Sequence, residues 1–139
     1  MPLHPLPHDA LTMTPHGTEI RAALPWIRSM PLSSVRGLEI EIDGAPPASL
    51  SIALGAREIA PDALAAEPGW WFLQDRLVLR CPPVSPGSHR VALRFQLTVP
   101  YLPAGPDAPL TVPISGERDL LAGAGPLPPA ARDAGEARP

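Results

Sequence analysis

Glu39 and Glu41 are the residues of this sequence whose type and spacing most directly suggest chemistry. They stand two positions apart in segment 35–43, where apolar residues alternate with them, so a strand there would project both carboxylates from one face. A pair of carboxylates is what a glycoside hydrolase requires. The pair would, however, lie on an exposed face without a pocket, where acidic side chains block the addition of a further strand. We therefore interpret it as a solvated strand face, and an enzyme that uses it is kept as an alternative.

The other reactive side chains give no catalytic set. Cys81 is the single cysteine, so no internal disulfide is possible, and its place after a predicted strand is typical of a small, half-buried residue. His4, His8 and His16 could together bind a metal, but they lie in a segment without periodicity, and we interpret them as surface histidines. The sequence has no Ser/His/Asp order, no glycine-rich phosphate loop and no CxxC pair. We predict no catalytic residue and no metal ligand in this chain.

Length and composition restrict the class of protein. A chain of 139 residues is long enough for one domain with its own core. All 11 basic residues are arginine, the net charge is −3 and no basic patch is present, which argues against nucleic acid as a partner. The first residues lack the pattern of a signal peptide, and no apolar run reaches membrane-spanning length. We expect a cytoplasmic protein that does not bind a membrane.

The longest strand signal is segment 88–99, in which apolar and polar residues alternate strictly over ten positions. Shorter signals predict the other elements, with a single short helix over 62–67. These further strands are predicted at 18–25, 35–43, 49–54, 70–73, 76–80 and 110–114. The last of them should lie at a sheet edge, because Pro113 cannot donate a hydrogen bond to a neighbour.

Many short strands, frequent turn signals and almost no helix predict an all-β fold, namely an antiparallel β-sandwich of about seven to eight short strands. We place the sandwich domain at residues 17–121. Residues 1–16 are rich in proline and histidine and are expected to form a disordered N-terminal arm. Residues 122–139 are rich in Ala, Gly and Pro and are expected to form a disordered C-terminal tail.

Two segments concentrate large apolar side chains. The loop 26–32 carries Trp26 and Met30, which need a cover from either the domain's own core or a partner. The run 70–73 places two tryptophans side by side, and adjacent strand residues point to opposite faces. One tryptophan should therefore enter the core, while the other could stack on a sugar, fill a protein interface or be covered by a loop.

Two stretches, taken in order, resemble the small β subunit of C-glycoside deglycosidases. The first runs from Pro25 to Gly44 (PWIRSMPLSSVRGLEIEIDG) and is similar to a family segment in which an aromatic–Arg–small loop leads into a strand that ends in Asp-Gly. The second runs from Pro86 to Pro103 (PGSHRVALRFQLTVPYLP) and is similar to the family's late strand and its tyrosine-containing exit. The resemblance covers roughly residues 18–120. Where the family often has Tyr-Tyr-Arg-Gly, this chain has Trp-Ile-Arg-Ser at 26–29, a difference that points to a different aglycone.

The resemblance implies a β-sandwich bound to an α subunit, a TIM-barrel protein similar to sugar-phosphate isomerases and epimerases. That α subunit would bind a divalent metal, typically Mn²⁺, and carry the catalytic acid–base residues. The complex would be a lyase that cleaves the carbon–carbon bond between a 3-oxo-glucosyl group and an aromatic aglycone, such as that of a flavonoid glycoside, by proton abstraction beside the ketone and elimination.

A chain without a catalytic set but with an apolar loop fits the role of such a non-catalytic partner. Its candidate interface residues are Trp26, Arg28, Met30, Trp71 and Tyr101, because aromatic residues and arginine dominate interface energetics. For each of them, ordinary core packing is the alternative. A second hypothesis for the whole chain is a free-standing carbohydrate-binding β-sandwich. The lack of a secretion signal and of disulfides argues against it.

Overall fold

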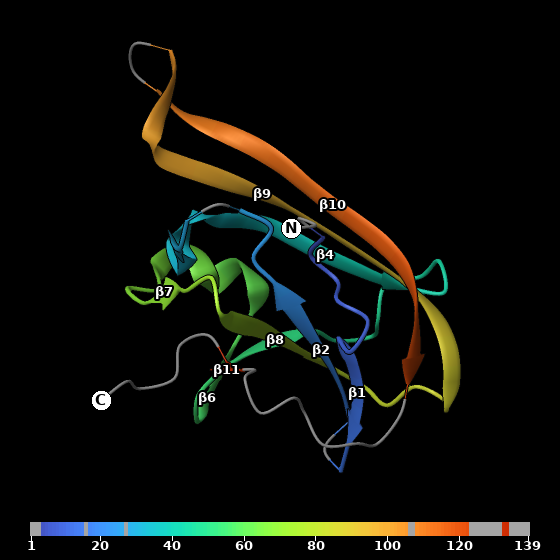
Figure 1. The fold of residues 1–139 in the computed structure, drawn as a ribbon. Coiled ribbons are helices and arrows are strands. Elements are labelled where there is room, and N and C mark those ends of the chain that lie inside the picture. The colour runs from blue at the N-terminus through green and yellow to red at the C-terminus, as the bar shows by residue number, and fades with distance from the viewer. Residues whose placement is uncertain (1–3, 16, 27, 106–107, 123–131, 134–139) are drawn as a thin grey trace.

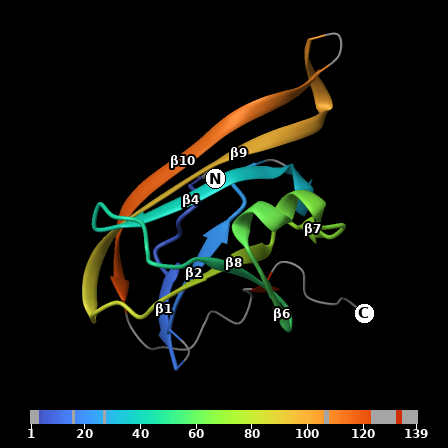
Figure 2. The same ribbon diagram turned by 180° about the vertical axis from the view of Figure 1, so that it is seen from behind.

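The computed structural model describes residues 4–15, 17–26, 28–105, 108–122 and 132–133. They form two main sheets, antiparallel except for the short β11 described below, that lie face to face, as Figure 1 shows and as Figure 2 shows from behind. The larger sheet has the strand order β1-β2-β8-β5-β6. Its strands are β1 (Leu11–Thr14), β2 (Gly17–Ala23), β8 (Asp75–Cys81), β5 (Ser51–Leu54) and β6 (Arg57–Ile59). The predicted all-β sandwich is confirmed.

The smaller sheet contains the strand that the sequence marks most clearly. Its order is β10-β9-β4, with β10 at Ala108–Ala122, β9 at Gly87–Gly105 and β4 at Val35–Ile42. The alternation in segment 88–99 of β9 directs five large apolar side chains into the core, where they are at most 3% exposed. These are Val91, Leu93, Phe95, Leu97 and Val99. Each such side chain contributes about 1.5–3 kcal/mol when it is removed from water, so β9 is a major source of stability.

The larger sheet meets β9 with a matching apolar face. Ile20 of β2, Leu79 of β8 and Ile52 of β5 lie opposite one another across three neighbouring strands, and all three are fully buried. Cross-strand rows of this kind hold a sheet together and fix its register, because a shift by one residue would turn the row toward solvent.

Residues 4–15 differ from the expected disordered arm over 1–16, whose residues 1–3 and 16 lie outside the described part of the chain. Leu6, Ala10 and Leu11 are buried, and β1 pairs with β2. The carbonyl of Pro5 accepts a hydrogen bond of 2.9 Å from the backbone N–H of Ala23. Prolines hide the strand period of this segment, but their carbonyls still accept hydrogen bonds, so an extended proline-rich chain can be held against a sheet. The packed domain therefore includes residues before the predicted boundary at 17.

At the other terminus, the predicted edge strand 110–114 is part of the much longer β10. Its position at the sheet edge, expected from Pro113, is confirmed. Of the predicted tail 122–139, Ala122 ends β10, and β11 (Arg132–Asp133) pairs in parallel with the start of β8. The rest of that tail lies outside the described residues, so the expectation of disorder stays a prediction.

Short elements complete one end of the sandwich. β3 (Met30–Pro31) pairs with β7 (Trp70–Trp71), and the 3-10 helix η1 (Leu32–Ser34) follows β3 directly. The predicted helix at 62–67 is the 3-10 helix η2 (Pro61–Ala66). When the two-residue strands β3, β7 and β11 are set aside, eight strands remain among the described residues, which matches the predicted number.

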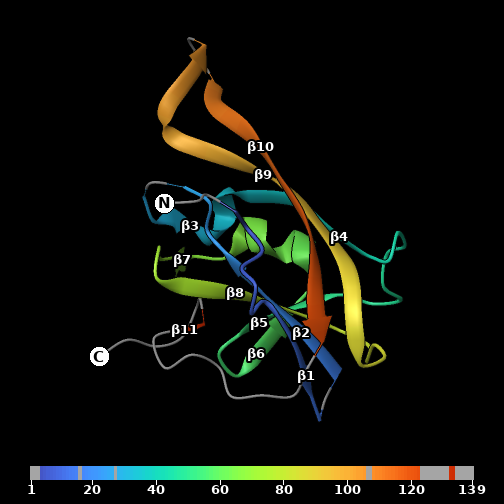
Figure 3. The same cartoon turned by 45° about the vertical axis from the view of Figure 1, so that its right-hand side comes forward.

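The hairpin of β9 and β10 extends beyond the rest of the smaller sheet. β10 pairs with β9 along its length, whereas β4 pairs with β9 only between Val91 and Leu97. Past Leu97, no third strand joins the hairpin in the part of the chain that the structure describes. This two-stranded extension projects at the end of the sandwich where β3 and β7 lie (Figure 1, Figure 3).

Candidate functional site

The predicted interface residues occupy different environments. Arg28 is exposed, and Trp26 is half-buried and packs against the core. Both therefore present side-chain atoms at the molecular surface. Tyr101 belongs to β9, but its side chain lies outside the described residues, so its predicted contact stays a prediction.

Met30 and Trp71 lie inside the core. They pair with each other across β3 and β7, and neither side chain has exposed surface. The indole N–H of Trp71 donates a hydrogen bond of 3.1 Å to the carbonyl oxygen of Asp75, and its ring lies 6.0 Å from the ring of Phe95. Core packing, the alternative for these two residues, is therefore their observed role. In this conformation they support the surface from beneath and do not reach a partner.

The surface above them carries further apolar side chains that are not among the interface residues predicted from the sequence. Trp70 is 46% exposed and Leu73 is 44% exposed. The half-buried ring of Phe72 stacks on Trp70 with a centroid distance of 6.5 Å. The backbone N–H of Leu73 donates a hydrogen bond of 2.9 Å to the hydroxyl of Ser29, which ties this turn to the loop that carries Trp26 and Arg28. We call the set Trp26, Arg28, Trp70, Phe72 and Leu73 the aromatic end.

The run WWFL at 70–73 was the sequence signal for this surface. Because successive side chains of a strand point to opposite faces, the sequence predicts that one tryptophan faces outward, but not which one. The register of β3 against β7 decides the question, because it brings Trp71 opposite the buried Met30.

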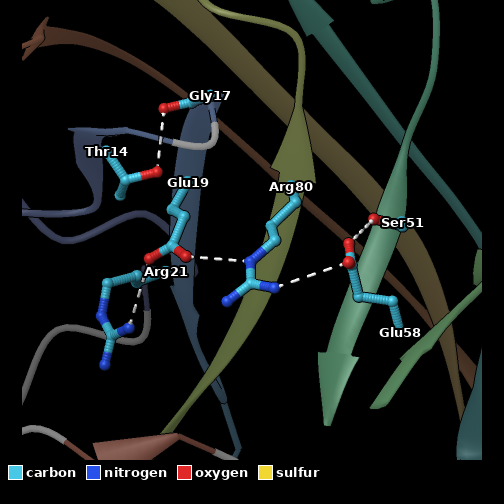
Figure 4. Close-up of polar contacts among 7 residues, drawn as sticks. All are labelled: Thr14, Gly17, Glu19, Arg21, Ser51, Glu58 and Arg80. Atoms are coloured by element: carbon cyan, nitrogen blue, oxygen red, sulfur yellow. Dashed lines mark hydrogen bonds and ion pairs between the residues drawn. The ribbon is translucent and has the colours of Figure 1, made fainter. Parts of the chain in front are cut away.

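The outer face of the larger sheet carries a ladder of charged side chains, next to the buried Val78 and Ala53 (Figure 4). The Nε atom of Arg80 lies 2.9 Å from a carboxylate oxygen of Glu19, and its Nη1 lies 3.6 Å from Glu58. The hydroxyl of Ser51 donates a hydrogen bond of 2.7 Å to Glu58. The ladder joins β2, β8 and β6, so its simplest role is to hold neighbouring strands together.

An open surface pocket of about 430 Å³ lies beside this ladder. It is lined by Ser49, Ser51, Glu58, Arg80, Cys81 and Pro82. Burial raises the pKa of the Cys81 thiol, because a thiolate is poorly solvated there. A thiol that stays protonated is a weak nucleophile, so the pocket supplies no activated group.

The paired carboxylates of β4 are neutralised on the surface. Arg94 of the neighbouring strand β9 reaches both, with its Nη2 atom 2.9 Å from Glu39 and 4.0 Å from Glu41. A catalytic acid needs a pKa raised by burial in an apolar site. Here the side chains are substantially exposed and are paired with a guanidinium. The interpretation of this pair as a solvated strand face is confirmed.

Ser85, His89 and Asp43 have the residue types of a catalytic triad, but their geometry is that of a structural clamp. His89 Nδ1 lies 2.6 Å from the Asp43 carboxylate, while Nε2 lies 2.6 Å from the backbone carbonyl of Ser85 and 3.5 Å from its hydroxyl. A general base would have to offer Nε2 as an acceptor to that hydroxyl. Here Nε2–H instead donates a hydrogen bond to the backbone carbonyl of Ser85.

The clamp favours a charged imidazole. The hydrogen bond to Asp43 and then that to the Ser85 carbonyl raise the pKa of His89, and the same contact to His89 lowers the pKa of Asp43. Asp43 also accepts a hydrogen bond of 2.9 Å from the N–H of Arg90, and its φ of 54° is the left-handed conformation typical of a tight turn. His89 and Asp43 are far apart in the sequence, so no local pattern could have revealed this cluster.

The described residues contain no group of three or more His, Cys, Asp or Glu side chains that could hold a metal ion. Nor do they include a helix long and apolar enough to cross a membrane. The contacts above assign structural roles to the ion pairs and to His89. The class defined by the fold and its surfaces is therefore a β-sandwich domain with an aromatic surface at one end.

Sequence comparison with known proteins identifies the family to which this domain belongs. No protein-family model matches the chain. It is 34% identical over 100 residues to the 3'-dehydrocarminate deglycosidase beta subunit of a Microbacterium species, with 68% of this chain and 76% of that protein covered. It is 33% identical to the C-glycoside deglycosidase beta subunit of Microbacterium trichothecenolyticum, with 60% and 67% covered, and 30% identical to that of Arthrobacter globiformis, with 68% and 77% covered. The chain belongs to the family of C-glycoside deglycosidase beta subunits, as the resemblance of its two motifs predicted.

Proposed function

We propose that this chain is the non-catalytic β subunit of a lyase that releases the aglycone from 3-oxo-glucosyl C-glycosides. Its partner is a TIM-barrel α subunit that holds a divalent metal, such as Mn²⁺, and the acid–base residues. The proposal is supported above all by the similarity to three proteins named as deglycosidase beta subunits. The name of a beta subunit implies a complex with at least one other kind of subunit.

The proposed division of labour follows from what the reaction requires. A base removes the proton on the carbon next to the sugar ketone, the electron pair forms a carbon–carbon double bond in the sugar, and the bond to the aglycone breaks. The aglycone carbon then takes up a proton. The step needs a base close to that carbon and a group that stabilises the developing oxyanion. In this chain, Glu39 and Glu41 face Arg94, and His89 is held by Asp43, so we assign both tasks to the α subunit.

The predicted contacts at Trp26 and Arg28 are retained in the proposal, because both residues have surface to offer. Met30 and Trp71 act on this surface only by holding it in place. Tyr101 is retained as a contact of the β9–β10 hairpin.

Co-purification with the product of an adjacent gene for an isomerase-like barrel tests the proposed function. We expect light scattering to give a stable hetero-oligomer. Cleavage of a 3-oxo C-glycoside should need both chains, should be lost after treatment with EDTA and should return with Mn²⁺. The proposal fails if the purified chain alone cleaves the substrate, or if the two chains do not associate.

One observation favours the carbohydrate-binding alternative. Trp70 is 46% exposed and stacks on Phe72, and an exposed aromatic surface can also stack on a sugar ring. Calorimetric titration of the chain alone with glucose and with C-glycosides separates the two functions. Specific binding by a stable monomer that ignores the barrel protein would support the alternative.

A further inference from the structure

We propose that the α subunit binds the aromatic end of this domain together with the projecting part of the β9–β10 hairpin. The inference rests on the proposed function, since it assigns a surface to that partner. It differs from the interface predicted from sequence: Trp70, Phe72 and Leu73 replace Met30 and Trp71 as the residues that make contact.

The distribution of exposed apolar side chains supports this location. Only three large hydrophobic residues are strongly exposed in the part of the chain that the structure describes: Trp70, Leu73 and Leu121. Trp70 and Leu73 lie in the aromatic end, where the half-buried ring of Phe72 stacks on Trp70. Leu121 belongs to the end of β10 that pairs with the start of β9, and this end of β10 lies away from β3 and β7 (Figure 1). Clustered exposed apolar groups mark protein interfaces, whereas a single one does not.

The distribution of charged side chains on the two outer faces also supports this location of the interface. The outer face of the larger sheet carries the Glu19–Arg80–Glu58 ladder. The outer face of the smaller sheet carries Arg94 between the two β4 glutamates, and Arg90 with Glu117 at 3.0 Å and Asp119 at 3.3 Å. Charged side chains are depleted from the buried centre of protein interfaces. The aromatic end is therefore the better surface for an extensive contact.

Contacts within the domain already hold the aromatic end in place. Ser29 fixes the backbone at Leu73, Phe72 stacks on Trp70, and the buried Trp71 anchors the turn from beneath. Side chains that are already ordered lose little conformational entropy on binding, which raises affinity for a given contact area.

The hairpin supplies the second part of the surface. Beyond Leu97 it has only two strands among the described residues, and it projects at the same end as β3 and β7 (Figure 3). Two-stranded hairpins are at best marginally stable in water unless a further element packs on them. A partner seated on the aromatic end would lie beside this extension and could provide that element.

The test compares two variants at the aromatic end, Trp70→Glu and Leu73→Glu, with the control Leu121→Glu. All three change an exposed apolar residue into the same charged one, and Leu121 is the most exposed of them at 71%. Affinity for the metal-loaded α subunit is measured by calorimetry, and circular dichroism checks that each variant is folded. We expect Kd to rise at least about tenfold for both aromatic-end variants and less than about twofold for Leu121→Glu.

The proposal is overturned if the aromatic-end variants bind as the wild type does, or if Leu121→Glu weakens binding as much as they do. If the wild-type chains do not associate at all, the proposed function fails instead. Sedimentation of the chain alone tests whether a second copy of the chain binds this surface instead of the α subunit. A homodimer that Trp70→Glu dissociates would assign the surface to that second copy.

Hydrogen exchange on the wild-type complex gives an independent readout. The backbone amides in 101–105 should exchange at least about tenfold more slowly in the complex than in the free chain, because the hairpin extension gains a neighbour. Unchanged exchange there would exclude the hairpin from the interface.

Discussion

Trp70 and Trp71 are neighbours in the chain, yet the first is 46% exposed and the second has no exposed surface. The pairing of Trp71 with Met30 across β3 and β7 produces this difference. Trp71 therefore supports the core, whereas Trp70 forms part of the surface, so substitutions at the two positions should affect different properties.

Replacing Trp71 with alanine should reduce the free energy of unfolding by about 3–5 kcal/mol, because it removes a fully buried indole and leaves a cavity. Trp70→Ala should reduce it by less than about 1 kcal/mol. Urea unfolding of both variants measures the difference. Trp71→Phe, which keeps a ring but loses the hydrogen bond to Asp75, should fall between them. Equal losses at 70 and 71 would contradict the assignment of support and surface.

Stability should depend on pH through the His89–Asp43 clamp. The pKa of folded His89 is raised above its ordinary 6.5, so its contribution is fully present below about pH 6.5 and is lost as the pH rises through the folded value. The pKa of folded Asp43 is lowered from 3.8, so its contribution is present above about pH 3.8 and is lost as the pH falls through the folded value. The clamp should stabilise the domain most between these limits.

The variant His89→Gln tests this dependence. We expect the free energy of unfolding of the wild type to decrease as the pH rises above about 6.5, and that of the variant to decrease less. His8→Gln, a change at an exposed histidine, is the control and should follow the wild type. Identical profiles for His89→Gln and the wild type would remove the clamp as the cause.

Gly116→Ala should destabilise the domain by about 1–3 kcal/mol. A Cβ atom at this position would lie 2.6 Å from Cγ of Pro5, so the N-terminal segment would have to move away from β10. Ser115→Ala, on the exposed face of the same strand, should change stability by less than about 0.5 kcal/mol. Thermal unfolding of both variants provides the comparison, and a neutral Gly116→Ala would mean that the segment does not need this close contact.

Arg80→Ala should reduce the free energy of unfolding by about 0.5–1 kcal/mol, since the ladder that it breaks is partly exposed and screened by water. The loss should shrink when the NaCl concentration is raised from about 0.05 M to about 1 M. Cleavage by the complex should be unchanged. A large loss of activity with a small loss of stability would show that the ladder serves the reaction.

The double variant Glu39→Gln/Glu41→Gln should leave the cleavage rate of the complex within about twofold of the wild type, because these carboxylates face Arg94 on an open surface. The assay with a 3-oxo C-glycoside measures the rate. A rate more than about a hundredfold lower would instead make this pair catalytic, as expected for loss of a general acid or base.

Much of the sandwich could be predicted because its central strands carry a local signal. The apolar side chains of β9 recur every second residue, and all of them are buried as predicted. Pro113 indicated an edge, and β10 is one. The N-terminal segment gave no such signal, because it is held by contacts to residues far away in the sequence, Ala23 and Gly116, that no local period encodes.

The candidate site was predictable only in part for the same reason. The sequence located the aromatic run, but the choice between Trp70 and Trp71 depends on the partner strand β3. The clamp likewise forms only when β4 and β9 pair, since that pairing brings Asp43 beside His89 and Arg90.

The packing of the N-terminal segment against β10 has a consequence during synthesis of the chain. Pro5 is synthesised before Gly116, against which it packs, and most of the domain lies between the two. Contacts between such distant residues close late and slow folding. The nascent chain must therefore carry Leu6 and Leu11 uncovered until β10 has emerged, a period in which chaperones have apolar surface to bind.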